Sequence, residues 1–124
     1  MKLTKNFDSK EFDCKDGTPA KGSDLENVKV LASNLQVLRD HLGKPITITS
    51  GYRTVSHNAK QQGSSPVSQH LYGRAADIKV AGMTPRQVAN EIEKLIASGK
   101  MRQGGIGVYP TFTHYDIRGT KARW

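Results

Sequence analysis

The stretch that decides the fold is SQHLYGRAAD, residues 68–77, which predicts a tight turn leading into a buried strand. Gly73 permits a turn that a residue with a Cβ would resist. The two alanines that follow let the strand run close to neighbouring backbone. His70 and Asp77 stand seven positions apart on either side of these small residues. Because His and Asp are typical zinc ligands, the same stretch also suggests part of a metal site.

The segments around this stretch predict a mixture of helices and strands. Alternating and β-branched residues indicate strands, whereas apolar residues at spacings of three and four indicate helices. The predicted strands are 45–50, 75–80, 105–109 and 112–118, and the predicted helices are 24–42, a short one over 55–62 before Gly63, and 84–98. A loop is expected at 64–66. The order helix, strand, short helix, strand, helix and then a hairpin is typical of an α+β domain, so we expect a small, mainly antiparallel sheet packed against helices.

Two sequence signals mark the starts of the long helices. Ser23 followed by Glu26 predicts a capping box with Ser23 as the N-cap residue. Thr84, Pro85 and Gln87 predict an N-cap, a proline at the first helical position and a second capping box. We expect both helices to be structural.

Length and composition bound the class of protein. A chain of 124 residues suits one domain with one core, so we expect a single domain over 1–124 with an irregular arm at 1–22. No apolar run approaches the roughly 20 residues of a membrane span, and the N-terminus lacks the apolar segment of a secretory signal. We therefore expect a monomeric cytoplasmic protein, or one exported by another route. The single cysteine, Cys14, excludes an intrachain disulfide and a cysteine-rich zinc finger.

The formal net charge of +8 predicts attraction to a polyanion, such as nucleic acid, anionic lipid or anionic cell-wall polymers. The basic residues are spread along the chain, and the densest group is Arg118, Lys121 and Arg123. The sequence contains no nucleic-acid-binding motif that we can identify, so we expect no nucleic-acid partner. A basic surface that binds nothing is the alternative.

A second pair of polar residues lies in THYDIR, where His114 and Asp116 are two positions apart. On a strand this spacing places both side chains on one face. An exposed face is one explanation, and a solvated strand edge would likewise explain Asp77. If His70, Asp77 and His114 converge, however, two imidazoles and one carboxylate would leave zinc an open position, as in catalytic sites. Asp116 is then the expected general base for a zinc-activated water whose pKa falls towards about 7.

The spacing S-x-H-x-x-G-x-A-x-D, formed by Ser68, His70, Gly73, Ala75 and Asp77, resembles the zinc motif of the D-Ala-D-Ala carboxypeptidase family of metallopeptidases, which includes phage endolysins. SGYRTVSHN at 50–58 and GGIGVYPTFTHYDIRG at 104–119 resemble the same family and occur in the right order. KNFDSKEFDCKDG near the start resembles its entry segment. The resemblance implies the hedgehog/DD-peptidase fold in its small, single-domain form.

Carried over by position, the resemblance implies that His70, Asp77 and His114 bind one zinc ion per chain. It implies that Arg53 takes part in catalysis by pairing with a substrate carboxylate, which suits its bidentate, permanently charged side chain. Without the resemblance, a surface ion pair would explain Arg53. The remaining expected substrate-binding residues are Ser68, Tyr52 and His57, and a structural role is the alternative for His57.

The sequence departs from the family at one position. Many relatives carry an acidic residue shortly before the last zinc histidine, whereas Thr111, Phe112 and Thr113 precede His114 here. The general base is therefore assigned to Asp116 by substitution.

The leading hypothesis is a zinc metallopeptidase that hydrolyses peptidoglycan stem peptides at a bond involving a D-amino acid. Both a D-Ala-D-Ala carboxypeptidase and an endolysin-type endopeptidase fit these motifs. A phage-type lysis protein that stays cytoplasmic until release, or a virion-associated one, fits the missing signal. The alternative is a zinc-containing binding module without catalysis, as in hedgehog signalling domains, and nucleic-acid binding rests on charge alone.

Overall fold

The computed structural model describes residues 1–61 and 67–124. Its elements are a 3₁₀ helix η1 (Ser9–Phe12), α1 (Ser23–Leu42), β1 (Ile46–Ser50), α2 (Val55–Ala59), a 3₁₀ helix η2 (Gln69–Tyr72), β2 (Ala75–Val80), α3 (Pro85–Ala97), β3 (Gly105–Val108), β4 (Thr113–Asp116) and β5 (Ala122–Arg123). The last position of the expected 55–62 helix and the expected loop at 64–66 lie outside the described residues. Within the described part, no helix has the combined length and apolarity of a bilayer-crossing segment.

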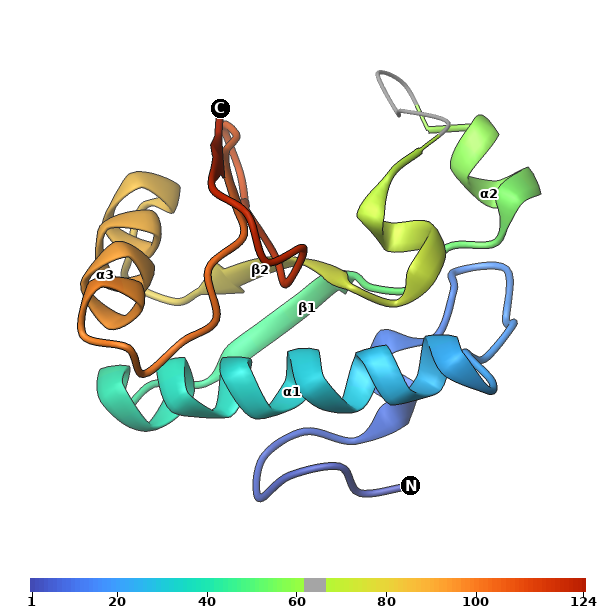
Figure 1. The fold of residues 1–124 in the computed structure, drawn as a ribbon, viewed down its shortest axis with the longest axis horizontal. Helices are drawn as coiled ribbons and strands as arrows, with labels where there is room; N and C mark the ends of the chain where they lie inside the picture. Colours follow the sequence, from blue (N-terminus) through green and yellow to red (C-terminus); the bar gives the residue numbers. More distant parts are fainter. Residues whose placement is uncertain (62–66) are drawn as a thin grey trace.

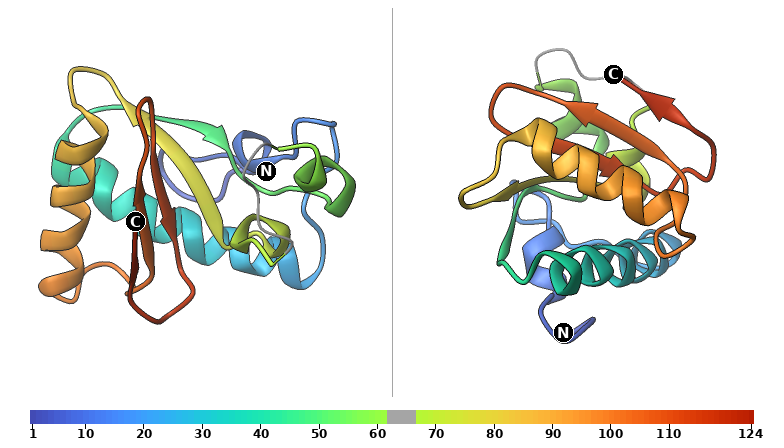
Figure 2. Two further views of the ribbon diagram at one scale, coloured as in Figure 1. Left: turned by 90° about the horizontal axis from the view of Figure 1, so that it is seen from above. Right: turned by 90° about the vertical axis from the view of Figure 1, so that its left-hand side faces the viewer.

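The strands form one sheet in the order β1-β2-β4-β3-β5. All neighbouring pairs are antiparallel except β3 and β5, which are parallel. Helix α1 packs against β2, and α3 packs against β3 and β4 (Figures 1 and 2). The α+β class with a mainly antiparallel sheet is confirmed. Strand β5 was not expected, because two residues are too few to show an alternating pattern.

The pairing register gives the sheet two chemically different faces. Ala76 pairs with Tyr115 and belongs to the buried hydrophobic core, whereas Asp77 pairs with His114 one position along. Because side chains alternate across a strand, Asp77, His114 and Asp116 share the opposite face from the core. The polar residues noted in the sequence therefore gather on one side of the sheet.

Helix α3 begins as the sequence predicts. Thr84 accepts a hydrogen bond from the backbone N–H of Gln87, whose side chain accepts one from the backbone N–H of Thr84. The capping box expected at Ser23 is wrong, because α1 starts one residue earlier, with Gly22 as N-cap. Gly22 has a φ of 59°, which favours glycine, and its carbonyl accepts the first helical hydrogen bond, from Glu26.

The N-terminal arm is irregular apart from η1, yet it contributes to the core. Phe7 and Phe12 are almost fully buried in the hydrophobic cluster. The backbone N–H of Tyr52 donates to the carbonyl of Phe12 at 2.8 Å. A Cβ at Gly51 would lie only 2.8 Å from the Cα of Phe12, so glycine is needed for this close approach. The arm is thus fixed beside the segment that follows β1.

Candidate metal centre and its pocket

Neighbouring elements bring His70, Asp77 and His114 together. The β2–β4 register places Asp77 directly opposite His114, and η2 supplies His70. Oδ1 of Asp77 lies 3.4 Å from Nε2 of His70 and 3.2 Å from Nδ1 of His114. All three residues are buried, and their ligand atoms lie within 4.8 Å of one another.

His70 is held by its backbone and by its other ring nitrogen. Ser68 is the N-cap of η2 and accepts a hydrogen bond from the backbone N–H of His70. Gly73 ends η2 with a φ of 71°, as the turn predicted from the sequence requires. Nδ1 of His70 lies 2.7 Å from the carbonyl oxygen of Gly51. A carbonyl can only accept, so Nδ1 carries the proton and Nε2 presents its lone pair to Asp77.

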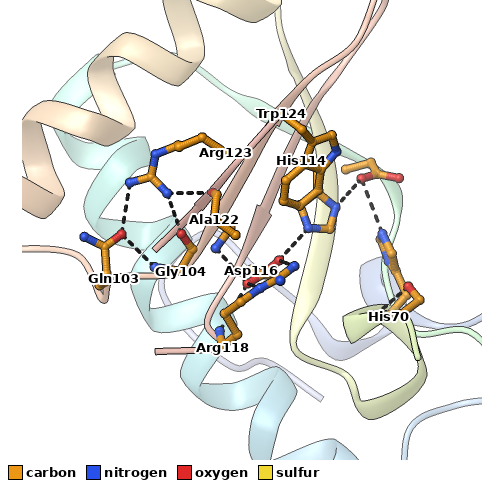
Figure 3. A network of polar contacts seen from close by, with 12 residues as sticks. His70, Gln103, Gly104, His114, Asp116, Arg118, Ala122, Arg123 and Trp124 are labelled. Carbon is orange, nitrogen blue, oxygen red and sulfur yellow. Dashed lines mark hydrogen bonds and ion pairs between the residues drawn. The ribbon is translucent and has the colours of Figure 1, made fainter. Parts of the chain in front are cut away.

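His114 is oriented in the same way by a carboxylate. Its Nε2 lies 2.7 Å from Oδ2 of Asp116 (Figure 3), whereas its other ring nitrogen, Nδ1, faces Asp77. Asp116 also accepts hydrogen bonds from the backbone N–H of Gly105 and from the guanidinium of Arg118. An ionised carboxylate can only accept, so Nε2 of His114 donates and Nδ1 presents its lone pair to Asp77.

This geometry does not support the general-base role expected for Asp116. Its side chain is completely buried, and it does not line the pocket in front of Asp77. Burial raises the pKa of Asp116, but the hydrogen bonds from His114 and Arg118 outweigh burial and leave that pKa below its usual value. A base must reach the water that it deprotonates. Asp116 instead holds the imidazole of His114 in position.

The three facing atoms suit a cation. Nε2 of His70, Nδ1 of His114 and Oδ1 of Asp77 all present lone pairs to the same small space when both rings are neutral. Such a cluster is unfavourable unless a positive charge lies between its members. Two imidazole nitrogens and one carboxylate oxygen form the donor set of a catalytic zinc site, and each histidine has its second nitrogen hydrogen-bonded, as metal-binding histidines do. The residues therefore fit zinc.

The pKa of Asp77 agrees with this electrostatic picture. Burial raises it, but when no cation lies between these groups His114 and His70 can donate to Asp77, and these contacts outweigh burial and leave the pKa below the usual range of a carboxyl group. Asp77 therefore stays ionised and available as a ligand.

Arg53 borders the same carboxylate from the other side. Its Nη2 lies 3.4 Å from Oδ2 of Asp77, and its Nε and Nη1 donate to Ser50 and Asn58. Burial lowers the pKa of the Arg53 guanidinium, and the charge of Asp77 opposes this effect. Within residues 1–61 and 67–124, three hydrogen bonds leave two of the five N–H groups for a ligand, and Arg53 lines the pocket.

A pocket of about 860 Å³ opens in front of the three ligands. Ser68 and His57 line it, as the sequence hypothesis requires, and Nε2 of His57 lies 3.2 Å from the side-chain nitrogen of Gln61. Tyr52 does not line it but packs against the hydrophobic core, so the structure does not support substrate binding by Tyr52. Tyr52 is held beside the N-terminal arm by its backbone hydrogen bond to Phe12, a contact that the short SGYR segment alone does not predict.

The sequence hypothesis missed several pocket residues. Trp124 lies 4.9 Å from His114 between ring centroids, and its Nε1 donates to the hydroxyl of Tyr109 at 2.7 Å. Lys15 enters the pocket from the N-terminal arm. No local pattern marks either residue, because their place depends on which distant segments pair.

Comparisons with known proteins agree with this site. A family model described as Peptidase M15 matches residues 5–116. The chain is 36% identical over 77 residues to a Haemophilus influenzae protein named probable peptidoglycan L,D-endopeptidase MepK, and 43% identical over 53 residues to the zinc D-Ala-D-Ala carboxypeptidase of Streptomyces albus G. These matches cover 57% and 42% of this chain but only 38% and 20% of the two relatives.

Proposed function

The chain belongs to the peptidase M15 family, and on this premise we propose that it is a zinc-dependent peptidase that hydrolyses stem peptides of bacterial peptidoglycan. The observation that carries the proposal is the buried trio of His70, Asp77 and His114 at the floor of a large pocket. The names of the two relatives support the substrate class.

The roles of the residues follow from their contacts. When bound, zinc lowers the pKa of a coordinated water and polarises a carbonyl group. His70, Asp77 and His114 hold the ion, and the Asp116–Arg118 pair keeps His114 aligned. Arg53 uses its two remaining N–H groups to bind a carboxylate of the peptide, and Ser68 keeps η2 in place under His70. His57 lies at the pocket wall, where it contacts the substrate.

The proposal is tested by metal replacement. Purified protein is incubated with peptidoglycan after chelator treatment, then with zinc added back, and soluble products are measured by mass spectrometry. Hydrolysis should disappear with the chelator and return with zinc. Full hydrolysis by metal-free protein would reject the proposal. The product masses also identify the bond, which separates a carboxypeptidase from an endopeptidase.

A zinc-containing binding module is a second candidate, and one observation favours it. Among the described residues, Asp77 is the only one with a carboxylate side chain that lines the pocket, so no second acidic side chain is present there to act as general base. A binding module would retain zinc and bind peptidoglycan in a pull-down assay but release no products. A peptidase would release them, and a cell-wall substrate suits a lysis protein of phage type or a virion component.

A further inference from the structure

We propose that Lys15 binds a free carboxylate of the substrate, separate from the one assigned to Arg53. This role rests on the proposed peptidase function and deepens it, because it requires a peptide with two carboxylates. Lys15 belongs to the N-terminal arm, of which one loop lies below α2 in Figure 1.

The loop that carries Lys15 is fixed on both sides of this residue. The backbone N–H of Thr54 donates to the sulfur of Cys14 at 3.5 Å, and the hydroxyl of Thr54 donates to Asp16 at 2.8 Å. The N–H of Gly17 donates to the carbonyl of Cys14, which closes a tight turn around Lys15. Thr54 is the N-cap of α2 and follows Arg53 directly. The turn is therefore tied to the same segment that positions Arg53.

The charge of Lys15 is not used within the described part of the protein. Three cationic side chains line the pocket there, namely Lys15, Arg53 and Arg118. Arg53 pairs with Asp77, and Arg118 pairs with Asp116. Lys15 is exposed and forms no ion pair or side-chain hydrogen bond with any described residue. It is the pocket cation that remains available for an anionic ligand.

The balance of charge also favours an anionic ligand. Once the pairs Arg53–Asp77 and Arg118–Asp116 are counted, the described lining retains one unpaired cation, Lys15. A cleft with an excess of one charge raises the local concentration of oppositely charged ligands. Stem peptides carry a terminal carboxylate and can carry a second one on their glutamyl residue, so they match two separate cations.

The test uses zinc-loaded protein and three synthetic stem pentapeptides that end in D-Ala-D-Ala. One peptide has free carboxyl groups at both the glutamyl residue and the C-terminus, and each of the others has one of these groups converted to an amide. Lys15→Met removes the charge, Lys15→Arg retains it, and Lys5→Met is a matched control on an exposed lysine outside the pocket.

For wild type and Lys5→Met, amidation of the carboxyl group that Lys15 binds should raise KM about tenfold relative to the peptide with both groups free. Lys15→Met should abolish this difference and leave kcat unchanged. Lys15→Arg should restore it. If Lys15→Met discriminates between all three peptides as wild type does, the role of Lys15 is overturned. If wild type hydrolyses no peptide, the peptidase proposal fails instead. Kd values from quenching of Trp124, the single tryptophan, then decide the role of Lys15 by the same comparison.

Discussion

Nε2 of His114 lies 2.7 Å from Oδ2 of a completely buried Asp116, on the side of the ring opposite Nδ1, which faces Asp77. A carboxylate in this place fixes the tautomer and the angle of a ligating histidine. Asp116 could have acted as the general base or as a support for His114. Because it contacts His114 and does not line the pocket, the structure favours the supporting role.

Replacing Asp116 by asparagine should therefore weaken zinc binding, and not only slow the hydrolysis of the peptide. Loss of a carboxylate that supports a ligating histidine typically costs 10- to 100-fold in metal affinity. Zinc affinity is measured by competition with a chromophoric chelator, and Asp40→Asn is the matched control because Asp40 is exposed near the end of α1 and does not line the pocket. Unchanged zinc affinity together with complete loss of hydrolysis would restore the general-base role.

Zinc should stabilise the folded protein. The three ligands are brought together only in the folded state, so at 100 times its Kd zinc adds about 2.7 kcal/mol to the free energy of unfolding. For a chain of this length that corresponds to a Tm increase of about 10 °C, measured by differential scanning fluorimetry. Asp77→Asn removes the carboxylate ligand, so zinc should not raise the Tm of this variant. A wild-type Tm that is insensitive to zinc would contradict the assignment.

Gly73→Ala should destabilise the protein and also displace His70, because Gly73 ends the η2 helix that carries this residue. Gly73 has a φ of 71°, and a Cβ there would lie 2.5 Å from the backbone oxygen of Asp24. A left-handed backbone costs a non-glycine residue about 1–3 kcal/mol, and the contact adds to this. Gly99 has a φ of 79° with no atom near its Cβ position, so Gly99→Ala reports the backbone cost alone. Urea denaturation should show the larger loss for Gly73→Ala, and equal losses would show that the contact relaxes freely.

Gly107→Ala should displace Trp124 from His114. A Cβ at Gly107 would lie 2.5 Å from Nε1 of Trp124, whose hydrogen bond to Tyr109 would then break. The indole should move towards solvent, and its fluorescence emission should shift to longer wavelength. Tyr109→Phe removes only the hydroxyl acceptor, so a smaller shift is expected. Identical spectra for Gly107→Ala and wild type would show that the ring is not held in this way.

Much of the secondary structure follows from short-range patterns. Thr84 and Gln87 mark the start of α3, alternation marks β2 and β4, and Gly73 marks the turn before β2. These signals depend on residues a few positions apart, so they can be recognised without knowledge of any tertiary contact. The same patterns placed Ser23 one residue wrongly, because Gly22 at the end of the docked arm accepts the first helical hydrogen bond.

Local patterns in the chain were enough to predict the helices, the principal strands and the residue types of the candidate metal site. The folded chain was needed to show that Asp77 lies opposite His114, that Asp116 is buried behind that ring, and that Lys15 reaches the pocket from a distant arm. The difference lies in how far apart along the chain the interacting residues are. A cap or an alternating pattern is a local property of the backbone, whereas burial, charge pairing and access to a ligand depend on which remote segments pack together.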